Sequence, residues 1–411
     1  MPPRLNERIR MLDIELSHPL RDIAGIDGYE RARALLRLHG TPVGLVDLPV
    51  RAGVLAAADI RAAVRDVAPD ALHAAGPAHA DVAPDARSLP TLTVAVCTRE
   101  RPEDLAGCLR ALERLDYPGV EILVVDNAPV SAATAAVCDE HPRVLRVVEP
   151  RPGLDWARNR AVLEATGEIL AFTDDDARVE PDWARRITEP FLADARVMAV
   201  AGLVVPLELE TRAQVLFEEY GGLSGGLKRM KIDPGPEWGV RGMWHYTLMA
   251  QHGSGANMAF RRRIFEIVGR FDPALDVGTP TNGGGDTELL LRVMAHGYAV
   301  VYEPRALVRH RHRRDEAGLR RQLAGWGSGS WAVLFRTAAA FPRSWWVLGL
   351  LGVRGLAHQG LRLARPGGVP RRLILSELGG AAAAPWRYLR ARRDARAIER
   401  AHGAQIRERP S

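Results

Sequence analysis

The sequence has few cysteines and lacks a cysteine-rich motif. Its 411 residues include only Cys97, Cys108 and Cys138. None of the three lies in a CxxC pair or at another metal-ligand spacing, and an odd number cannot all pair within one chain. This pattern argues against a disulfide framework and against a structural zinc site. We therefore expect a reducing compartment, the cytoplasm, as the location of the protein.

Long apolar segments are also missing. The best candidate, residues 345–353, is far shorter than the roughly 20 residues that a transmembrane helix requires, and Arg343 and Arg354 flank it. Near the N-terminus, Glu7, Asp13 and Glu15 stand where a signal peptide needs an apolar core. We expect neither a membrane span nor export, and any membrane contact to be peripheral, at the inner face of the membrane.

The composition is that of a globular protein with basic clusters. Hydrophobic residues make up 47% of the chain, enough for at least one sizeable core, and the length allows two or three domains. The formal net charge is only +6, yet arginines gather in residues 305–314 and 387–400. Such clusters attract phosphates or anionic lipid. Because no base-reading module accompanies them, we do not expect nucleic acid as a partner.

The hydrophobic pattern divides the chain into four parts. Residues 1–67 predict a small N-terminal α+β module, a hairpin plus a helix, and residues 68–90 have the composition of a linker. Strand patterns at 91–97, 120–125, 144–148, 169–173 and 197–204 alternate with helices, which predicts an α/β domain with a doubly wound, mostly parallel sheet over residues 91–315. Within it, the glycine-rich residues 207–247 are expected to form a lid. Residues 316–411 predict a helical C-terminal extension rich in Arg and Trp.

Three consecutive carboxylates, Asp174, Asp175 and Asp176, follow the strand predicted at 169–173. Two unit charges about 4 Å apart repel by roughly 4 kcal/mol at an effective dielectric near 20, so such a cluster favours a bound cation. Oxygen ligands favour Mg²⁺ or Mn²⁺, and Mg²⁺ commonly keeps substrate phosphates in its shell. The alternative is a solvated turn before the next helix, where Pro181 suits the first helical position.

Polar residues also follow other predicted strands, where ligands of open parallel sheets bind. Thr98 and Arg99 follow the first strand, and Asp126 and Asn127 follow the second. In order and spacing these residues resemble the family-two glycosyltransferases with the GT-A fold. The resemblance rests on segments 94–99, 124–127, 153–159, 174–176, 255–257, 284–288 and 302–310.

The resemblance implies a metal-dependent, inverting transfer of a sugar from a nucleotide-diphosphate donor to an acceptor hydroxyl. Asp174 and Asp176 match the Asp-any-Asp motif of the family, and His310 matches its third protein ligand to Mg²⁺ or Mn²⁺. The competing interpretation of His310 and His312 is a basic surface strand. The residues implied in nucleotide or donor binding are Thr98, Arg99, Asp126, Arg158, Asp174 and Asn257.

Asp286 matches the aspartate of the family's Glu-Asp motif, which the resemblance assigns as the general base that deprotonates the acceptor. Gly285 stands where the family has glutamate, and Glu288 is the reserve candidate for the base. A carboxylate at the start of a helix can instead be a cap that satisfies free backbone amides. The sequence leaves both roles open for Asp286.

The acceptor is not identified by the sequence, and a saccharide, a lipid carrier or a small molecule all remain open. Gln322 and Trp326 match part of the Gln-x-x-Arg-Trp motif of processive synthases, but Gly325 replaces its arginine. We therefore do not expect synthesis of a long polymer, and Trp326 is a candidate for the acceptor site.

Tryptophans in the C-terminal extension predict a face for an anionic membrane surface, with ordinary packing as the alternative. They are Trp331, Trp345, Trp346 and Trp386. Two further functional hypotheses stay open. One is a nucleotidyltransferase of sugar phosphates, which also uses a carboxylate-bound metal, and the other is a catalytically silent nucleotide-binding scaffold.

Overall fold

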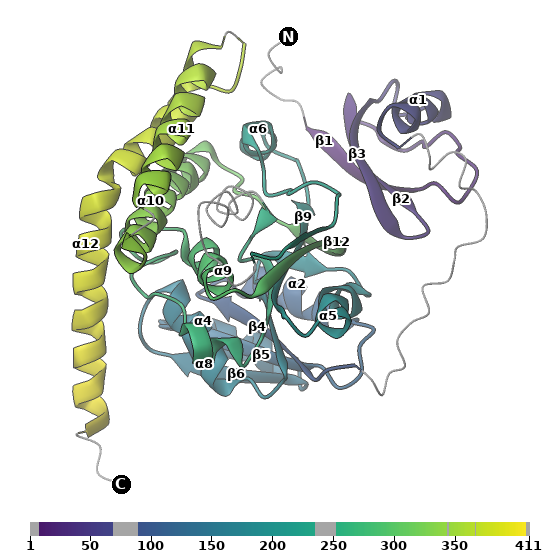
Figure 1. The fold of residues 1–411 in the computed structure, drawn as a ribbon. Coiled ribbons are helices and arrows are strands. Elements are labelled where there is room, and N and C mark those ends of the chain that lie inside the picture. The colour runs from purple at the N-terminus through teal and green to yellow at the C-terminus, as the bar shows by residue number, and fades with distance from the viewer. Residues whose placement is uncertain (1–7, 69–88, 235–251, 343–344, 366, 408–411) are drawn as a thin grey trace.

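The computed structural model describes residues 8–68, 89–234, 252–342, 345–365 and 367–407. A central α/β domain lies between a small N-terminal module on one side and a group of long C-terminal helices on the other (Figure 1). The N-terminal module and the central domain each have an apolar cluster of their own, whereas the C-terminal helices share their clusters with the central domain.

The central sheet has nine strands in the described part of the chain. Their order is β10-β12-β9-β11-β7-β4-β5-β6, and β8 pairs with β12. The strands are β4 (Leu92–Thr98), β5 (Glu121–Asn127), β6 (Val144–Glu149), β7 (Ile169–Asp174), β8 (Ala177–Val179), β9 (Val197–Pro206), β10 (Met230–Ile232), β11 (Asn257–Arg261) and β12 (Ala299–His310). Strands β6, β5, β4 and β7 run parallel, as do β9 and β12, whereas β11 is antiparallel to both of its neighbours.

Successive side chains of the central strands point to opposite faces of the sheet, and both sets are apolar. Helices therefore cover both faces. Val94 and Val96 face one core with α2 and α5, whereas Ala95 faces the other with α4 and α9. The helices of this domain are α2 (Pro102–Leu112), α3 (Ala133–Asp139), α4 (Leu154–Glu164), α5 (Trp183–Ala193), α6 (Arg212–Tyr220), α8 (Ile264–Val268) and α9 (Gly285–Ala295). The predicted α/β class is therefore confirmed, and the sheet is mixed, because β8, β10 and β11 pair antiparallel with their neighbours while the other pairs are parallel.

Strand β12 contains a bulge before its last four residues. Glu303 pairs with Gly202 of β9, and the next pair is Leu307 with Leu203, so residues 304–306 have no partner in the ladder. The side chain of Asn257 fixes this bulge, because its Nδ2 donates to the carbonyl oxygens of Ala306 (2.8 Å) and Leu203 (2.9 Å). Beyond the bulge, the strand continues to His310.

The N-terminal module is a three-stranded sheet with one helix. It consists of β1 (Ile9–Glu15), β2 (Arg31–Leu38), β3 (Thr41–Pro49) and α1 (Ala57–Val67). Strands β2 and β3 form the predicted hairpin, whose turn has positive φ at His39 and Gly40, as a type I′ turn requires. The prediction missed β1, which adds to β2 in parallel. The module docks on the central domain through a cluster that includes Leu35, Leu203, Val205 and Leu307.

The C-terminal part consists of α10 (Glu316–Ala340), α11 (Trp345–Ala364) and α12 (Arg371–Arg407). Helices α10 and α12 cross closely: a Cβ atom on Gly327 or Gly380 would overlap backbone atoms of the other helix, so glycine permits the contact. Among the helices that the structure describes, none combines the length and the apolar character needed to cross a bilayer.

The predicted lid at 207–247 is wrong for its first part. Residues 212–220 form helix α6, which begins with a capping box between Thr211 and Gln214. Residues 235–251, and residues 69–88 of the predicted linker, lie outside the described residues.

Candidate functional site

The predicted site residues lie where strands of the central sheet end. Thr98 ends β4, Asp126 and Asn127 end β5, and Asp174 ends β7. His310 ends β12 from a different part of the sequence. Strands β4, β5 and β7 are parallel, so their carboxyl ends meet at one edge of the sheet.

Asp174, Asp176 and His310 converge on one point. One ligand atom from each lies within 4.8 Å of the others, and His310 Nε2 is 3.0 Å from Asp176 Oδ1 and 3.8 Å from Asp174 Oδ2. Strand pairing places them, because the turn after β7 leads into β8, where Ala177 pairs with His310. Two carboxylates and an imidazole nitrogen are a donor set that suits Mn²⁺ or Mg²⁺. The three residues can thus hold a divalent ion.

The charges at this cluster are unequal. Burial raises the pKa of Asp174, and the Asp176 carboxylate raises it further. Burial also acts to raise the pKa of Asp176, but His310 and Arg101 outweigh it and the net pKa is lowered. Burial lowers the pKa of His310, but Asp176 and then Asp174 raise it more. The cluster therefore attracts positive charge, which is the property that a cation site needs.

Asp175, the middle member of the triplet, points away from the three converging residues. Thr98 Oγ1 donates to Asp175 Oδ2 at 2.7 Å, and Arg101 Nη1 lies 2.7 Å from Asp175 Oδ1. Burial and the neighbouring Asp176 raise the pKa of Asp175 to about 6. Arg101 also contacts Asp176 at 2.8 Å, so part of the repulsion expected within the triplet is relieved by the protein itself.

Two cavities adjoin the cluster and share Asp174 and Arg313 in their walls. The smaller, about 320 Å³, lies at the strand ends and is lined by residues that include Thr98, Arg99 and Asn127. The larger, about 960 Å³, extends toward α10 and includes Asp286 and Trp326 in its lining. The carboxylate cluster thus lies at the junction of two spaces, each large enough for part of a ligand.

Asp286 faces the larger cavity from the first turn of α9. Its Oδ2 accepts a hydrogen bond from the Gly255 backbone amide (2.7 Å), and its Oδ1 accepts one from the Thr287 amide (2.7 Å). The helix cap is Gly284, in a left-handed conformation, and not Asp286. Burial raises the pKa of Asp286, and the Asp276 carboxylate raises it further against the opposing effect of Arg158.

Comparison with known proteins agrees with this geometry. Residues 93–267 match the sequence model of the family described as "Glycosyl transferase family 2". This part of the chain is therefore similar to family 2 glycosyltransferases. Asp286 and His310 lie beyond the matched range, so their assignment depends on their position in the structure.

Several characterised proteins are similar to this chain. The succinoglycan biosynthesis protein ExoM of Rhizobium meliloti is 28% identical over 230 residues, which cover 53% of this chain and 65% of ExoM. The glucosyl-dolichyl phosphate glucuronosyltransferase of Haloferax volcanii is 24% identical over 233 residues, covering 54% and 69%. The pre-mycofactocin glycosyltransferase of Mycobacterium tuberculosis is 27% identical over 248 residues, covering 58% and 44%. The chain spans less than two thirds of two of these three proteins.

Among solved structures, the mannosyltransferase PcManGT from Pyrobaculum calidifontis, in complex with GDP-Man and Mn²⁺, aligns with a TM-score of 0.49. It is 21% identical, and the alignment covers 74% of this chain and 90% of that one.

Three residues predicted to bind the donor, Asp126, Arg158 and Asn257, are buried and already paired. Asp126 Oδ2 forms an ion pair with Arg146 at 3.0 Å, while its buried Oδ1 has no hydrogen-bond partner among the described residues. Arg158 lines the larger cavity and bridges Asp155 (3.0 Å) and Asp276 (2.5 Å).

Asn257 is fully buried, and its side-chain amide is committed to the fold. Its Oδ1 accepts from Trp183 Nε1 at 2.9 Å, and its Nδ2 holds the β12 bulge. The contacts of Asn257 are therefore structural, and the residue acts on the site by supporting the strand that presents His310.

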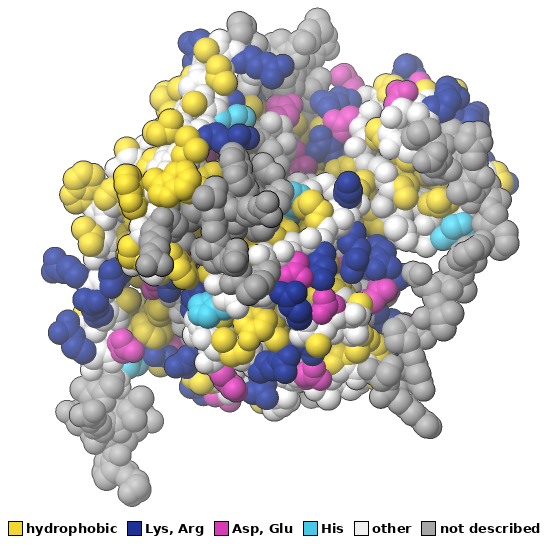
Figure 2. Space-filling model, viewed as in Figure 1, with side chains coloured by type: hydrophobic (Ala, Val, Ile, Leu, Met, Phe, Trp, Pro, Cys, Tyr) yellow, Lys and Arg dark blue, Asp and Glu magenta, His cyan; other side chains and the backbone are white. Residues whose placement is uncertain are grey.

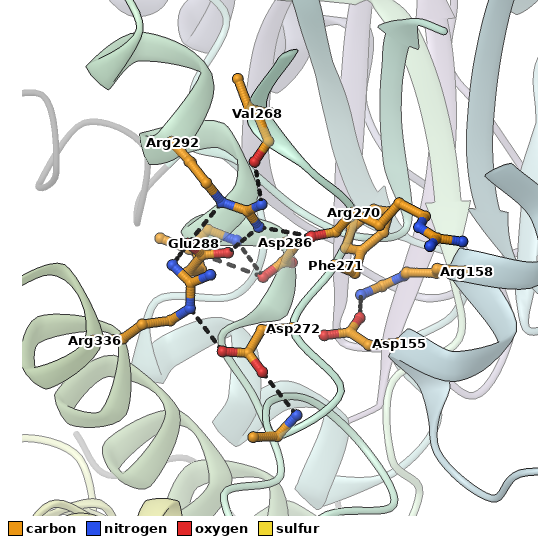
Figure 3. Close-up of polar contacts among 12 residues, drawn as sticks. Asp155, Arg158, Val268, Arg270, Phe271, Asp272, Asp286, Glu288, Arg292 and Arg336 are labelled. Atoms are coloured by element: carbon orange, nitrogen blue, oxygen red, sulfur yellow. Dashed lines mark hydrogen bonds and ion pairs between the residues drawn. The ribbon is translucent and has the colours of Figure 1, made fainter. Parts of the chain in front are cut away.

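Glu288, the reserve candidate for the base, is buried and does not line either cavity. Arg292 Nη2 lies 2.6 Å from Glu288 Oε2, and Arg336 of α10 contacts the other carboxylate oxygen. Figure 3 shows Glu288 between these two arginines, and Arg336 reaching on to Asp272. These contacts fasten α9 to α10, which is a structural role.

The space beside Gly285, where the family has a glutamate side chain, contains a carboxylate from helix α4. A Cβ atom on Gly285 would overlap Oδ2 of Asp155, a fully buried carboxylate on α4. Burial and the Asp276 carboxylate raise the pKa of Asp155 well above its ordinary value. Asp155 Oδ2 has no hydrogen-bond partner among the described residues, although Oδ1 is paired with Arg158. An acidic group thus lies beside Asp286 even though residue 285 is glycine.

Sequence reasoning did not single out several other residues near the site. Arg101 and Arg313 contact the triplet, and only Arg313 belongs to a feature that the sequence indicated, the basic cluster at 305–314. His312 is buried beneath α6, so the alternative of a basic surface strand for His310 and His312 is wrong.

Proposed function

We propose that this protein transfers a sugar from a nucleoside-diphosphate donor to an acceptor hydroxyl, with inversion at the anomeric carbon. The observation that supports it best is the convergence of Asp174, Asp176 and His310 at the junction of the two cavities. In this proposal the smaller cavity receives the nucleotide, and the larger one receives the sugar and the acceptor.

The chain's own residues supply most of the chemistry. Thr98, Arg99 and Asn127 line the space for the nucleoside, and the Arg313 guanidinium at the junction offsets phosphate charge. Asp286, facing the larger cavity, accepts the acceptor's proton on a carboxylate oxygen as the hydroxyl attacks. Its raised pKa makes it a stronger base than an ordinary aspartate. A divalent ion held by Asp174, Asp176 and His310 would neutralise negative charge on the departing diphosphate.

Product analysis tests this function directly. The purified protein is incubated with a panel of nucleotide sugars and Mn²⁺ or Mg²⁺, and we expect release of a nucleoside diphosphate, with chelation of the metal abolishing turnover. Release of pyrophosphate would instead identify a nucleotidyltransferase. Metal-dependent nucleotide binding without any turnover across the panel and a set of acceptors would indicate a silent scaffold.

The acceptor in this proposal is presented at a membrane surface. Figure 2 shows hydrophobic side chains gathered over the C-terminal helices. Trp345, Trp346 and Trp386 are 69%, 48% and 74% exposed, and basic residues of α12 such as Arg390 are exposed as well. Exposed tryptophans beside arginines suit an anionic lipid interface. Trp331, in contrast, is partly buried against the core. One relative is named as acting on glucosyl-dolichyl phosphate, a lipid-linked substrate.

Vesicle co-sedimentation tests the membrane surface. We expect the protein to bind vesicles that contain phosphatidylglycerol more strongly than neutral vesicles, and the W345A/W346A variant to lose this binding. The matched control is L145A/V148A, which removes two exposed apolar side chains from β6. Equal loss in both variants, or no loss in either, would contradict the proposal.

A further inference from the structure

A chain of polar contacts leads from His310, one of the three candidate metal ligands, to the N-terminal module. His310 Nδ1 lies 3.3 Å from His312 Nδ1, and His312 Nε2 lies 2.9 Å from Glu218 Oε1 on α6. Glu218 Oε2 accepts from Arg33 Nη1 on β2 at 2.9 Å. Four side chains from three separate parts of the sequence are thus connected in series, and the last belongs to the module for which the sequence offered no function.

The partners of each ring nitrogen indicate which atoms donate and which accept along this chain. The Glu218 carboxylate accepts hydrogen bonds, so His312 donates to it from Nε2. In a neutral imidazole the other nitrogen is an acceptor, so His312 Nδ1 accepts from Nδ1–H of His310. His310 Nε2 lies 3.0 Å from Asp176 Oδ1, so without a cation this nitrogen also carries a proton and donates it to the carboxylate. A cation bound by Asp174, Asp176 and His310 would replace that proton at Nε2, while Nδ1–H keeps its hydrogen bond to His312.

The surroundings hold these groups in place. His312 is 2% exposed, and its ring packs edge-on against Phe217 with centroids 4.6 Å apart. Arg33 is held from its other side by Asp47 of β3, with Arg33 Nε 2.6 Å from Asp47 Oδ1. Glu218 is therefore fixed between a buried histidine and an arginine that is itself anchored in the N-terminal sheet.

We infer that His312, Glu218 and Arg33 are positioning residues that orient His310 for metal binding, and that the N-terminal module completes the metal site by docking Arg33 onto Glu218. The inference depends on the metal site of the proposed function. Residues that support a metal-ligating histidine typically change metal affinity by about 10- to 100-fold when they are removed. The module is therefore part of the catalytic apparatus although it lines neither cavity.

The first experiment measures Mn²⁺ affinity, by calorimetry and by the EPR signal of free Mn²⁺, in the full-length protein. We expect H312F and E218L to bind Mn²⁺ about 10- to 100-fold more weakly than wild type. E218Q should fall between E218L and wild type, because the glutamine carbonyl can still accept from His312. Thermal melts establish that each variant is folded at the assay temperature.

The outcomes separate this inference from the proposed function. If wild type binds Mn²⁺ and folded H312F and E218L bind it within about twofold of wild type, the positioning role is wrong while the metal site stands. If E218Q binds as weakly as E218L, the argument from tautomers is wrong. If wild type itself does not bind Mn²⁺, with or without nucleoside diphosphate, the metal site of the proposed function fails and the inference fails with it.

The second experiment isolates the N-terminal module by comparing R33A with R37A. Both arginines are on β2, have side chains 15% and 16% exposed, and reach out of the module, but Arg37 contacts Glu180 at 3.3 Å and not Glu218. We expect R33A to weaken Mn²⁺ binding and R37A to leave it unchanged. The conservative R33K variant should recover part of the loss. Equal Mn²⁺ affinity in R33A and R37A would overturn the role of the module.

Discussion

The acidic triplet at 174–176 and the pair Asp286 and Glu288 are both short carboxylate runs at an element boundary, but their members have different partners. Asp174 and Asp176 converge with a histidine from a distant strand, whereas Asp286 accepts hydrogen bonds from two backbone amides. The remaining member of each run, Asp175 or Glu288, is held by arginine. The groups that contact each carboxylate thus indicate its role better than the acidity of the sequence does. They distinguish a candidate cation ligand from a candidate base and from a member of a structural ion pair.

The largest effect should come from removing one carboxylate of each kind. We expect D176N to lose most Mn²⁺ affinity and nearly all turnover, because it removes a ligand. D286N should keep the Mn²⁺ affinity of wild type and lose about 10²- to 10⁴-fold in kcat, the usual contribution of a positioned base. Calorimetry and steady-state kinetics measure the two quantities. Loss of Mn²⁺ binding in D286N would remove the distinction between the two runs.

The pH dependence of the rate should follow Asp286. Because burial raises its pKa, the carboxylate stays protonated to a higher pH than a free aspartate. We expect kcat/KM at saturating Mn²⁺ to fall as the pH decreases through this raised pKa, and to be steady above it. Mn²⁺ affinity measured at the same pH values controls for titration of the metal ligands. A rate that stays level down to about pH 4, near the ordinary aspartate pKa, would contradict the base assignment.

Glu288 should affect stability more than catalysis. E288Q breaks a buried ion pair with Arg292 and Arg336, which should lower the free energy of unfolding by up to about 3–5 kcal/mol. Denaturant unfolding measures the loss, and kinetics below the melting transition should show a kcat within about twofold of wild type. A large decrease in kcat without a change in stability would return Glu288 to the candidates for the base.

The smallest effect concerns the contact between Gly285 and Asp155. G285A should lower the free energy of unfolding by about 1–3 kcal/mol, because its Cβ overlaps the Asp155 carboxylate. In a D155A background the same substitution should cost less, since the overlapping oxygen is gone. A double-mutant cycle measures this coupling. Additive effects would show that the carboxylate does not occupy the space beside residue 285.

Much of the central domain could be predicted from the sequence, because its strands are apolar runs that end in polar residues. The strands predicted at 169–173 and 197–204 agree with β7 and β9 to within two residues at each end. Strand β1 was missed because its residues alternate irregularly and no turn signal separates them from the N-terminus. Helix α6 was missed because glycines follow it closely, although Thr211 and Gln214 form a recognisable capping box.

The site was predictable in part. Asp174 and Asp176 are two residues apart at the end of one strand, so their predicted role as metal ligands follows from local spacing. The state of Glu288 depends on Arg336, 48 residues further along the chain, which no local pattern reveals. His312 was interpreted as part of a surface strand because its neighbours are arginines, but α6 covers it through Phe217. Long-range packing decided both cases.

The bulge in β12 divides the strand into two paired segments, and the second segment ends in His310. Side chains of a strand alternate between the two faces of a sheet, and the three unpaired residues 304–306 separate the two paired segments of β12. A one-residue slip of the segment after the bulge against β9 and β8 would turn the imidazole to the opposite side of the sheet, away from Asp174 and Asp176. The position of His310 therefore depends on the register of β12 beyond the bulge, and Asn257 supports that register through its hydrogen bonds to Ala306 and Leu203.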